Sequence, residues 1–165
     1  MFVGQYEVRL DAKHRVSVPL TLRESRKPDA PLWSVFYLTA GAEGCISVYT
    51  PEGWEQFMEG IGANKAIADS DLRVLQRLVA AQAVLRECDT QGRIIIADHL
   101  RIHAGLTRDV TWVGAASRAE IWDAGRWAEY QKKHISQLGE KMDLVSRFGL
   151  ALTQRPDATS KGSGA

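Results

Sequence analysis

The sequence predicts an α+β protein in which two repeats of one chain form a pseudo-twofold pair. Residues 11–19 (DAKHRVSVP) return as residues 89–97 (DTQGRIIIA), with the aspartate, the arginine and the apolar positions in the same register. A second block, residues 45–49 (CISVY), returns as residues 118–122 (RAEIW). Two copies are too few for a solenoid, which needs at least about three stacked units. The repeat therefore predicts two halves that share one core.

Length and composition are those of a globular protein. The 165 residues are 45% hydrophobic and 25% charged, both average for a folded domain. No apolar run approaches the roughly 18 residues that a membrane helix needs, and the start MFVG lacks the pattern of a signal peptide. The cysteines, Cys45 and Cys88, are too few for a metal site and are predicted to be reduced thiols. We therefore expect a cytoplasmic protein that needs no metal.

Charge is distributed unevenly along the chain, although the net charge is only +1. Residues 1–27 contain six basic and three acidic side chains, whereas residues 52–71 contain five acidic side chains and one lysine. This asymmetry predicts a molecule with one basic face.

The first elements are two strands and a short helix. Residues 6–10 and 15–18 flank a turn and are predicted to form a hairpin. Pro19 suits the first turn of a short helix that ends at Glu24, because its fixed φ is helical and its missing N–H costs nothing there.

Two further strands and two helices complete the first half. The strands are expected at residues 35–38 and 46–49, and the first helix begins at Pro51. Asp69 or Ser70 can cap the second helix. One face of that helix is expected to be apolar and the other polar: Leu72, Leu75, Leu78 and Val79 against Arg73, Gln76 and Arg77.

The second half repeats this order. Strands are expected at residues 83–88, 93–96, 110–114 and 118–122, with a helix near residues 98–104, Gly105 as its C-cap, and a last helix from Asp123 onward. We expect a first repeat over residues 1–80 and a second over residues 81–150. Residues 151–165 are small and polar at their end and are predicted to be a disordered tail.

Four aromatic side chains at matching places are the predicted core anchors. They are Tyr49 and Trp54 in the first repeat, and Trp122 and Trp127 in the second. An isolated hairpin is marginal in water, so each half must bury its apolar strand face against the other.

The repeated turn carries the chemistry. Asp11 and Asp89 each open a tight turn, where a carboxylate can accept hydrogen bonds from backbone amides two residues further on. Gly92 suits a position with positive φ. His14 occupies the same place in the first copy, where the left-handed conformation costs an L-residue roughly 1–2 kcal/mol, so the first turn is predicted to be strained.

Arg15 and Arg93 end the two turns, and two roles remain open for them. Each can fold back on its aspartate as a surface ion pair worth at most about 1 kcal/mol. Alternatively, the turns present basic residues to DNA, since a two-stranded ribbon fits the major groove and arginine pairs with guanine through two hydrogen bonds. The candidate DNA-binding residues are Arg9, Lys13, His14, Arg15, Arg86 and Arg93.

These features resemble the MraZ family over roughly residues 1–148. The resemblance rests on the start MFVG, the two D-x-x-x-R elements, and residues 104–106 (AGL), 113–114 (VG) and 120–122 (EIW). It implies tandem domains like those of AbrB and SpoVT, which form a double-split, swapped-hairpin β-barrel with peripheral helices.

The resemblance also implies a function. Members of the family are bacterial transcriptional regulators that bind short G-rich direct repeats upstream of their own operon, the division and cell-wall gene cluster, usually as repressors. They assemble into rings and contact DNA through the D-x-x-x-R hairpins. Carried over to this chain, this indicates Arg15 first, then Lys13 and Arg93, whereas His14 stands where the family usually has glycine. The implied partners are promoter DNA and further copies of the chain, at the nucleoid, with no cofactor and no small-molecule substrate.

Other classes of function remain as alternatives. An AbrB-fold antitoxin binds DNA and a toxin protein, although such antitoxins usually carry one copy of the repeat. A purely structural ring would show no salt-sensitive DNA binding. Asp98, His99 and His103 are the best candidate catalytic or metal-binding group, but the glutamate of H-E-x-x-H is missing, so we expect no enzyme.

Overall fold

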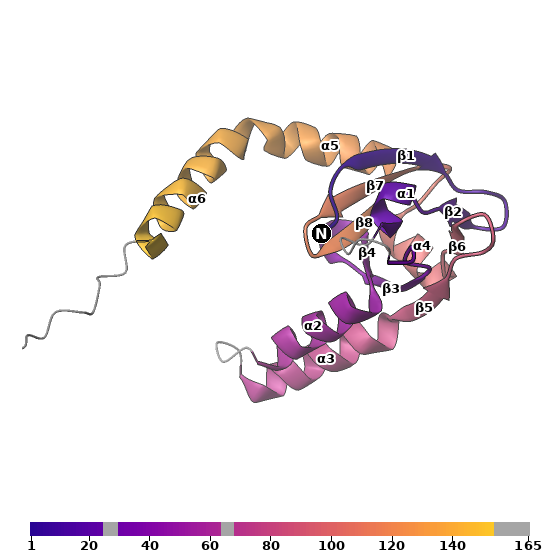
Figure 1. The fold of residues 1–165 in the computed structure, drawn as a ribbon, viewed down its shortest axis with the longest axis horizontal. Helices are drawn as coiled ribbons and strands as arrows, with labels where there is room; N and C mark the ends of the chain where they lie inside the picture. Colours follow the sequence, from indigo (N-terminus) through magenta and orange to yellow (C-terminus); the bar gives the residue numbers. More distant parts are fainter. Residues whose placement is uncertain (25–29, 64–67, 154–165) are drawn as a thin grey trace, which may run out of the picture. The chain divides into compact units, whose positions relative to one another are not determined.

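The computed structural model describes residues 1–24, 30–63 and 68–153, with side chains up to residue 147 (Figure 1). The chain divides into two compact units, Met1–Trp127 and Ala128–Ala165. The repeated sequence blocks, residues 11–19 with 89–97 and 45–49 with 118–122, all lie in the first unit. None of the described helices is long and apolar enough to span a membrane.

The first unit contains a six-stranded antiparallel sheet and a two-stranded sheet. The order in the large sheet is β1 (Gln5–Arg9), β7 (Asp109–Ala115), β8 (Arg118–Asp123), β4 (Ile46–Tyr49), β3 (Val35–Ala40), β5 (Val84–Glu87). The small sheet pairs β2 (Arg15–Ser17) with β6 (Arg93–Ile95). Both orders are unchanged when the repeats are exchanged, which agrees with the predicted pseudo-twofold pair in an α+β fold.

The strands exchange partners between the repeats, and the predicted hairpin of residues 6–10 and 15–18 is wrong. β1 pairs with β7 and β2 pairs with β6, so the strands on either side of the first turn belong to different sheets. Val16 lies opposite Ile94, and both side chains are fully buried. The exchange buries the apolar face of two three-residue strands, which would be marginal alone. Among the described strands no pairing joins the two sheets, so the expected barrel is not closed.

Six α-helices accompany the described strands. They are α1 (Leu20–Arg23), α2 (Pro51–Gly62), α3 (Asp69–Gln82), α4 (Asp98–Ala104), α5 (Ala124–His134) and α6 (Leu138–Thr153), with short 3₁₀ turns at Ala42–Gly44 and Ile135–Gln137. Helices α2 and α3 connect β4 to β5 along the chain, and Figure 1 shows them packed side by side. The part of the predicted disordered tail beyond Thr153 lies outside the described residues.

Local capping explains two of the helix ends. The Thr50 hydroxyl accepts a hydrogen bond from Gly53 N at 3.1 Å, and Pro51 begins α2 as predicted. Gly105 is left-handed at the end of α4, with φ 59°, which confirms the predicted C-cap. The predicted cap of α3 is wrong. Ala68 holds the cap position, and Asp69 lies inside the first turn, where its negative charge interacts favourably with the positive end of the helix dipole.

The core of the first unit is formed by side chains of both sheets and of the helices α1 and α4, and its largest fully buried side chain is Trp112. Tyr49 and Trp122 are buried as predicted, whereas Trp54 and Trp127 are only partly buried. Trp112 was not among the expected anchors because no aromatic residue marks the matching place in the first repeat.

The predicted apolar face of α3 is only partly buried. Leu72 is buried and Val79 is partly buried, and the Val79 carbonyl accepts a hydrogen bond from the Thr39 hydroxyl on β3 at 3.2 Å. Leu75 and Leu78 remain 38% and 59% exposed. The helix packs against α2 and β3 along one narrow stripe, so apolar residues on its remaining faces stay at the surface.

Candidate nucleic-acid interface

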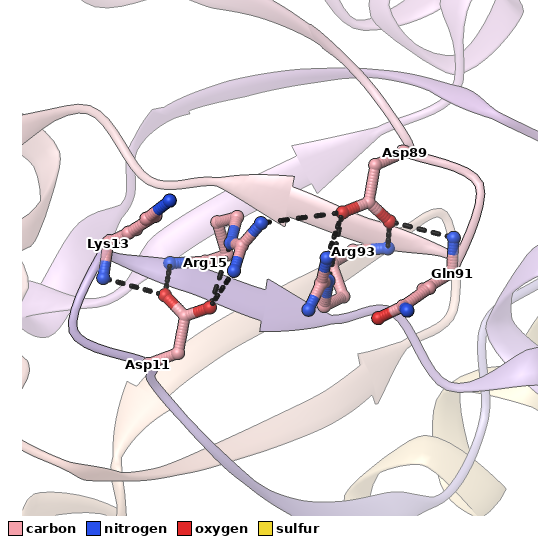
Figure 2. A network of polar contacts seen from close by, with 6 residues as sticks. All are labelled: Asp11, Lys13, Arg15, Asp89, Gln91 and Arg93. Atoms are coloured by element: carbon pink, nitrogen blue, oxygen red, sulfur yellow. Dashed lines mark hydrogen bonds and ion pairs between the residues drawn. The ribbon is translucent and has the colours of Figure 1, made fainter.

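Each repeated turn is organised around one aspartate (Figure 2). Asp11 Oδ1 accepts hydrogen bonds from the backbone N–H groups of Lys13 at 2.8 Å and Arg15 at 2.9 Å. Asp89 Oδ1 accepts the equivalent bonds from Gln91 at 2.9 Å and Arg93 at 3.0 Å. The same local hydrogen bonds thus shape both turns.

The other carboxylate oxygen of each aspartate holds an arginine side chain. Asp11 Oδ2 lies 2.7 Å from both Nε and Nη2 of Arg15. Asp89 Oδ2 lies 2.8 Å from Nε and 2.7 Å from Nη2 of Arg93. Of the two roles open for these arginines, the structure therefore shows the ion pair. The arginine side chains remain 27% and 26% exposed, so part of each side chain reaches solvent.

The β2–β6 pair brings the two turns together. Ser17 lies opposite Arg93, and Arg15 lies opposite Ile95. Arg15 Nη1 is 4.0 Å from Asp89 Oδ2, so one carboxylate faces the arginines of both repeats (Figure 2). Charged residues far apart in the sequence thus lie close together on the small sheet.

The fourth residue of each turn is left-handed. His14 has φ 55° and Gly92 has φ 73°. The His14 ring also lies close to α4, with Nδ1 3.3 Å from Asp98 Oδ1. The two turns therefore have the same backbone but differ in side chain at the strained position.

Replacing Gly92 with alanine is expected to lower the free energy of unfolding by about 1–2 kcal/mol, since a left-handed conformation carries that cost for an L-residue. His14→Gly is the matched control at the equivalent position, and it relieves the same strain instead of adding it. Urea unfolding of both variants measures the difference. A Gly92→Ala variant as stable as the unmodified protein would contradict the expectation.

The remaining candidate residues lie around this surface in different ways. Lys13 is exposed at the tip of the first turn. Arg9 lies on the edge strand β1, with Nε 3.4 Å from Asp109 Oδ1 and its side chain 74% exposed. Arg86 on β5 donates from Nε to the carbonyl of Ile95 at 3.1 Å, which places it beside β6. Arg9 and Arg86 thus belong to the large sheet and flank the turns.

Two arginines near the first turn were not predicted. Arg101 and Arg108 line, with His14, a groove of about 560 Å³ beside the turn. Arg101 Nε lies 3.6 Å from Asp98 Oδ1. The repeat carried a signal for Arg101, because Arg101 matches Arg23 in the first repeat. Arg23 lies beside the second turn, where a Cβ added at Gly92 would be 2.5 Å from Arg23 Nη1.

Arginine contacts lower the pKa of both aspartates. The Arg93 side chain and backbone hold the pKa of Asp89 at about 2, below its ordinary value of 3.8. The backbone hydrogen bond from Arg15 is the largest cause that lowers the pKa of Asp11. Both carboxylates are therefore ionised at neutral pH.

The Asp89 ion pair is expected to survive mild acid. A carboxyl group with a depressed folded-state pKa stabilises the fold above its unfolded pKa and loses that contribution as the pH falls through the folded value. The contribution of Asp89 should therefore be complete above about pH 4 and disappear as the pH approaches 2. An NMR titration of the side-chain carboxyl carbon measures this. A midpoint near 3.8 would show that the ion pair is absent in solution.

The candidate metal or catalytic group does not converge on one point. His99 Nε2 lies 3.1 Å from the Gln82 carbonyl, and His103 Nε2 lies 2.9 Å from the Gly41 carbonyl. In the described ranges no group of three or more His, Cys, Asp or Glu residues is placed to hold a metal ion. Cys45 and Cys88 are both free thiols, and burial raises the pKa of Cys45 to about 12.

Comparison with known proteins identifies relatives along almost the whole chain. The family described as "MraZ protein, putative antitoxin-like" matches twice, at residues 1–77 and 79–145. The protein named Transcriptional regulator MraZ from Lachnoclostridium phytofermentans is 38% identical over 151 residues, which cover 92% of this chain and 99% of that protein. The protein of the same name from Heliobacterium modesticaldum is 37% identical over 150 residues, covering 91% of this chain and 100% of that protein.

Proposed function

Because this chain belongs to the MraZ family, we propose that it is a DNA-binding transcriptional regulator that contacts DNA through the turns at residues 11–15 and 89–93. The relatives named transcriptional regulators support the regulatory role. The observation that carries the DNA contact is the joining of both turns by the β2–β6 pair, which places two arginines on one small sheet.

The small sheet has a suitable shape for DNA. A two-stranded antiparallel ribbon fits the major groove, where arginine distinguishes guanine from the other bases. Arg15 and Arg93 are the proposed base-reading residues. Lys13 at the exposed tip, with Arg9, His14 and Arg86 around the turns, is proposed to contact phosphates, which positions the protein without reading sequence.

The strand exchange between the repeats supports a swapped-hairpin arrangement. β1 and β2 leave the first turn toward β7 and β6 of the other repeat, and β5 and β6 leave the second turn toward β3 and β2. We propose that this exchange is the AbrB-like swapped-hairpin arrangement, in which the repeats over residues 1–80 and 81–150 interlock.

Several copies of the chain are proposed to act together as a ring. One chain offers only a few phosphate contacts and would bind weakly at physiological salt. Several copies on one DNA raise the affinity through effective concentration, commonly by about 100-fold or more. A head-to-tail ring matches direct repeats, whereas a twofold dimer would match a palindrome. The proposed target is a set of G-rich direct repeats in the promoter of its own operon, where binding at the nucleoid represses the division and cell-wall genes.

Binding to a labelled fragment from upstream of its own gene tests this function. The fragment is compared with a scrambled competitor at about 50 and 200 mM salt. The expected result is a discrete complex that survives competitor, weakens with salt and disappears when the G-rich repeats are mutated. Equal binding to both fragments, or binding to neither, would contradict a sequence-specific regulator. A gel-filtration or native mass measurement on the same sample tests the ring.

A protein-binding role in addition to DNA binding is the second candidate. The family description contains the words "antitoxin-like". On α3 three apolar side chains are at least one-third exposed: Val74, Leu75 and Leu78. A protein that copurifies with the chain and is lost when these residues are replaced by serine would favour this role.

A further inference from the structure

We infer that Asp11 and Asp89 are specificity-determining residues, because each holds its arginine side-on and leaves the end of the guanidinium to pair with one guanine. This inference rests on the proposed DNA-binding function. It assigns the two aspartates a role in base selection beyond shaping the turn.

A guanidinium has two edges that can form paired hydrogen bonds. One edge presents Nε and Nη2, and the end presents Nη1 and Nη2. In both turns Nε and Nη2 converge on a single oxygen, Oδ2 of the aspartate, at 2.7–2.8 Å. The side edge is therefore occupied in both turns. The end edge makes no hydrogen bond to either aspartate, although Arg15 Nη1 lies 4.0 Å from Asp89 Oδ2, so this edge is the one proposed to pair with the O6 and N7 acceptors of guanine.

The same carboxylate also holds the arginine side chain in one conformation before DNA binds. Oδ1 accepts two backbone N–H groups of the turn, while Oδ2 holds the guanidinium, so backbone and side chain share one anchor. An anchored side chain has less rotamer freedom to lose when it binds, so more of the contact energy appears as affinity. The geometry is present in the free protein and repeated in both turns.

The aspartates also disfavour the wrong contact. An unpaired arginine binds phosphate at any sequence, whereas a carboxylate beside the guanidinium repels phosphate oxygens. Each Asp–Arg pair should therefore weaken nonspecific binding while strengthening the guanine contact. Removing the negative charge is expected to change the ratio of specific to nonspecific affinity more than it changes the specific affinity alone.

Asp89 is expected to matter more than Asp11. Its Oδ2 holds Arg93 and also lies 4.0 Å from Arg15 Nη1, so it faces the guanidinium groups of both repeats. Asp11 Oδ2 makes its closest contacts with Arg15 of its own turn.

The variants Asp11→Asn and Asp89→Asn separate the two roles of each carboxylate. Asparagine keeps an oxygen that can accept the backbone N–H groups, but it replaces the second acceptor with an N–H₂ donor that cannot hold a guanidinium. Asp71→Asn is the matched control, because Asp71 is exposed in the first turn of α3 and lies outside both repeated turns. All three variants change the net charge equally.

The measured quantity is the ratio of dissociation constants for the scrambled and the promoter fragments. We expect this ratio to fall at least tenfold in Asp89→Asn and less in Asp11→Asn, with nonspecific binding unchanged or stronger. It should change less than twofold in Asp71→Asn. Replacing guanine in the promoter by 7-deazaguanine, which lacks the N7 acceptor, should weaken promoter binding by the unmodified protein more than it weakens binding by either turn variant.

NMR of the free, unmodified protein tests the geometry of the two Asp–Arg pairs and does not require that any variant folds. The Nε–H signals of Arg15 and Arg93 should exchange slowly with water, because both protons are held by carboxylates. Fast exchange of both signals would overturn the inference. If the unmodified protein prefers the promoter fragment and both turn variants keep that preference, the inference about the aspartates is overturned but the proposed function stands. If the unmodified protein shows no preference, the proposed function is overturned as well.

Discussion

Replacing Arg15 with alanine is expected to weaken binding to the promoter fragment by roughly 5- to 150-fold, since one paired arginine–guanine contact is worth about 1–3 kcal/mol. Arg93→Ala should have a similar or somewhat smaller effect. Binding to scrambled DNA should change much less, because phosphate contacts supply it. Titration of both fragments with each variant measures the effect.

A matched control separates loss of a DNA contact from loss of an ion pair. Arg118 forms a similar pair, with Nη2 2.7 Å from Glu120 Oε1 on β8, and it is not one of the proposed DNA contacts. Arg118→Ala should leave DNA binding nearly unchanged. If Arg15→Ala instead unfolds the protein or breaks its assembly, the ion pair with Asp11 is the main role of that arginine.

Replacing Trp112 with alanine is expected to lower the free energy of unfolding by about 3–5 kcal/mol, the usual cost of a large-to-small change in a core. Trp112 is fully buried on β7, where it lies opposite Tyr6 on one side and Ile121 on the other. Chemical denaturation followed by circular dichroism measures the loss. A change below about 1 kcal/mol would place this side chain outside the core.

Two further variants refine this prediction. Trp54→Ala should cost less, because Trp54 is only partly buried and stacks on Tyr37 at a centroid distance of 5.1 Å. Trp112→Phe should also cost less, since phenylalanine keeps most of the ring volume. Within the described residues the Trp112 indole N–H has no hydrogen-bond partner, so its removal leaves no acceptor unpaired.

Most elements of the fold follow from local patterns. The strand at residues 46–49, the start of α2 at Pro51 and the C-cap at Gly105 agree with prediction because alternation, proline and glycine act within a few residues. The cap of α3 and the extent of its buried face were predicted incorrectly. The extent of the buried face depends on how α3 packs against α2 and β3, which no pattern within the helix specifies.

The candidate site divides in the same way. The two aspartates, the left-handed His14 and Gly92, and the position of each arginine follow from the repeated segment, because a carboxylate reaches amides only a few residues away. Arg101 and Arg108 approach the first turn only through the packing of α4 and the strand β7 that follows it, and a pattern within the turn gives no sign of them.

The sequence by itself determined the two turns, the order of the elements and the pseudo-twofold repeat, since these depend on contacts between near neighbours and on self-similarity. Only the tertiary structure decided which strands pair. β2 and β6 present the same short apolar pattern to any partner, and pairing across the repeats is selected because it buries Val16 and Ile94 together. That exchange brings Arg15 to within 4.0 Å of Asp89 and makes one surface from two turns.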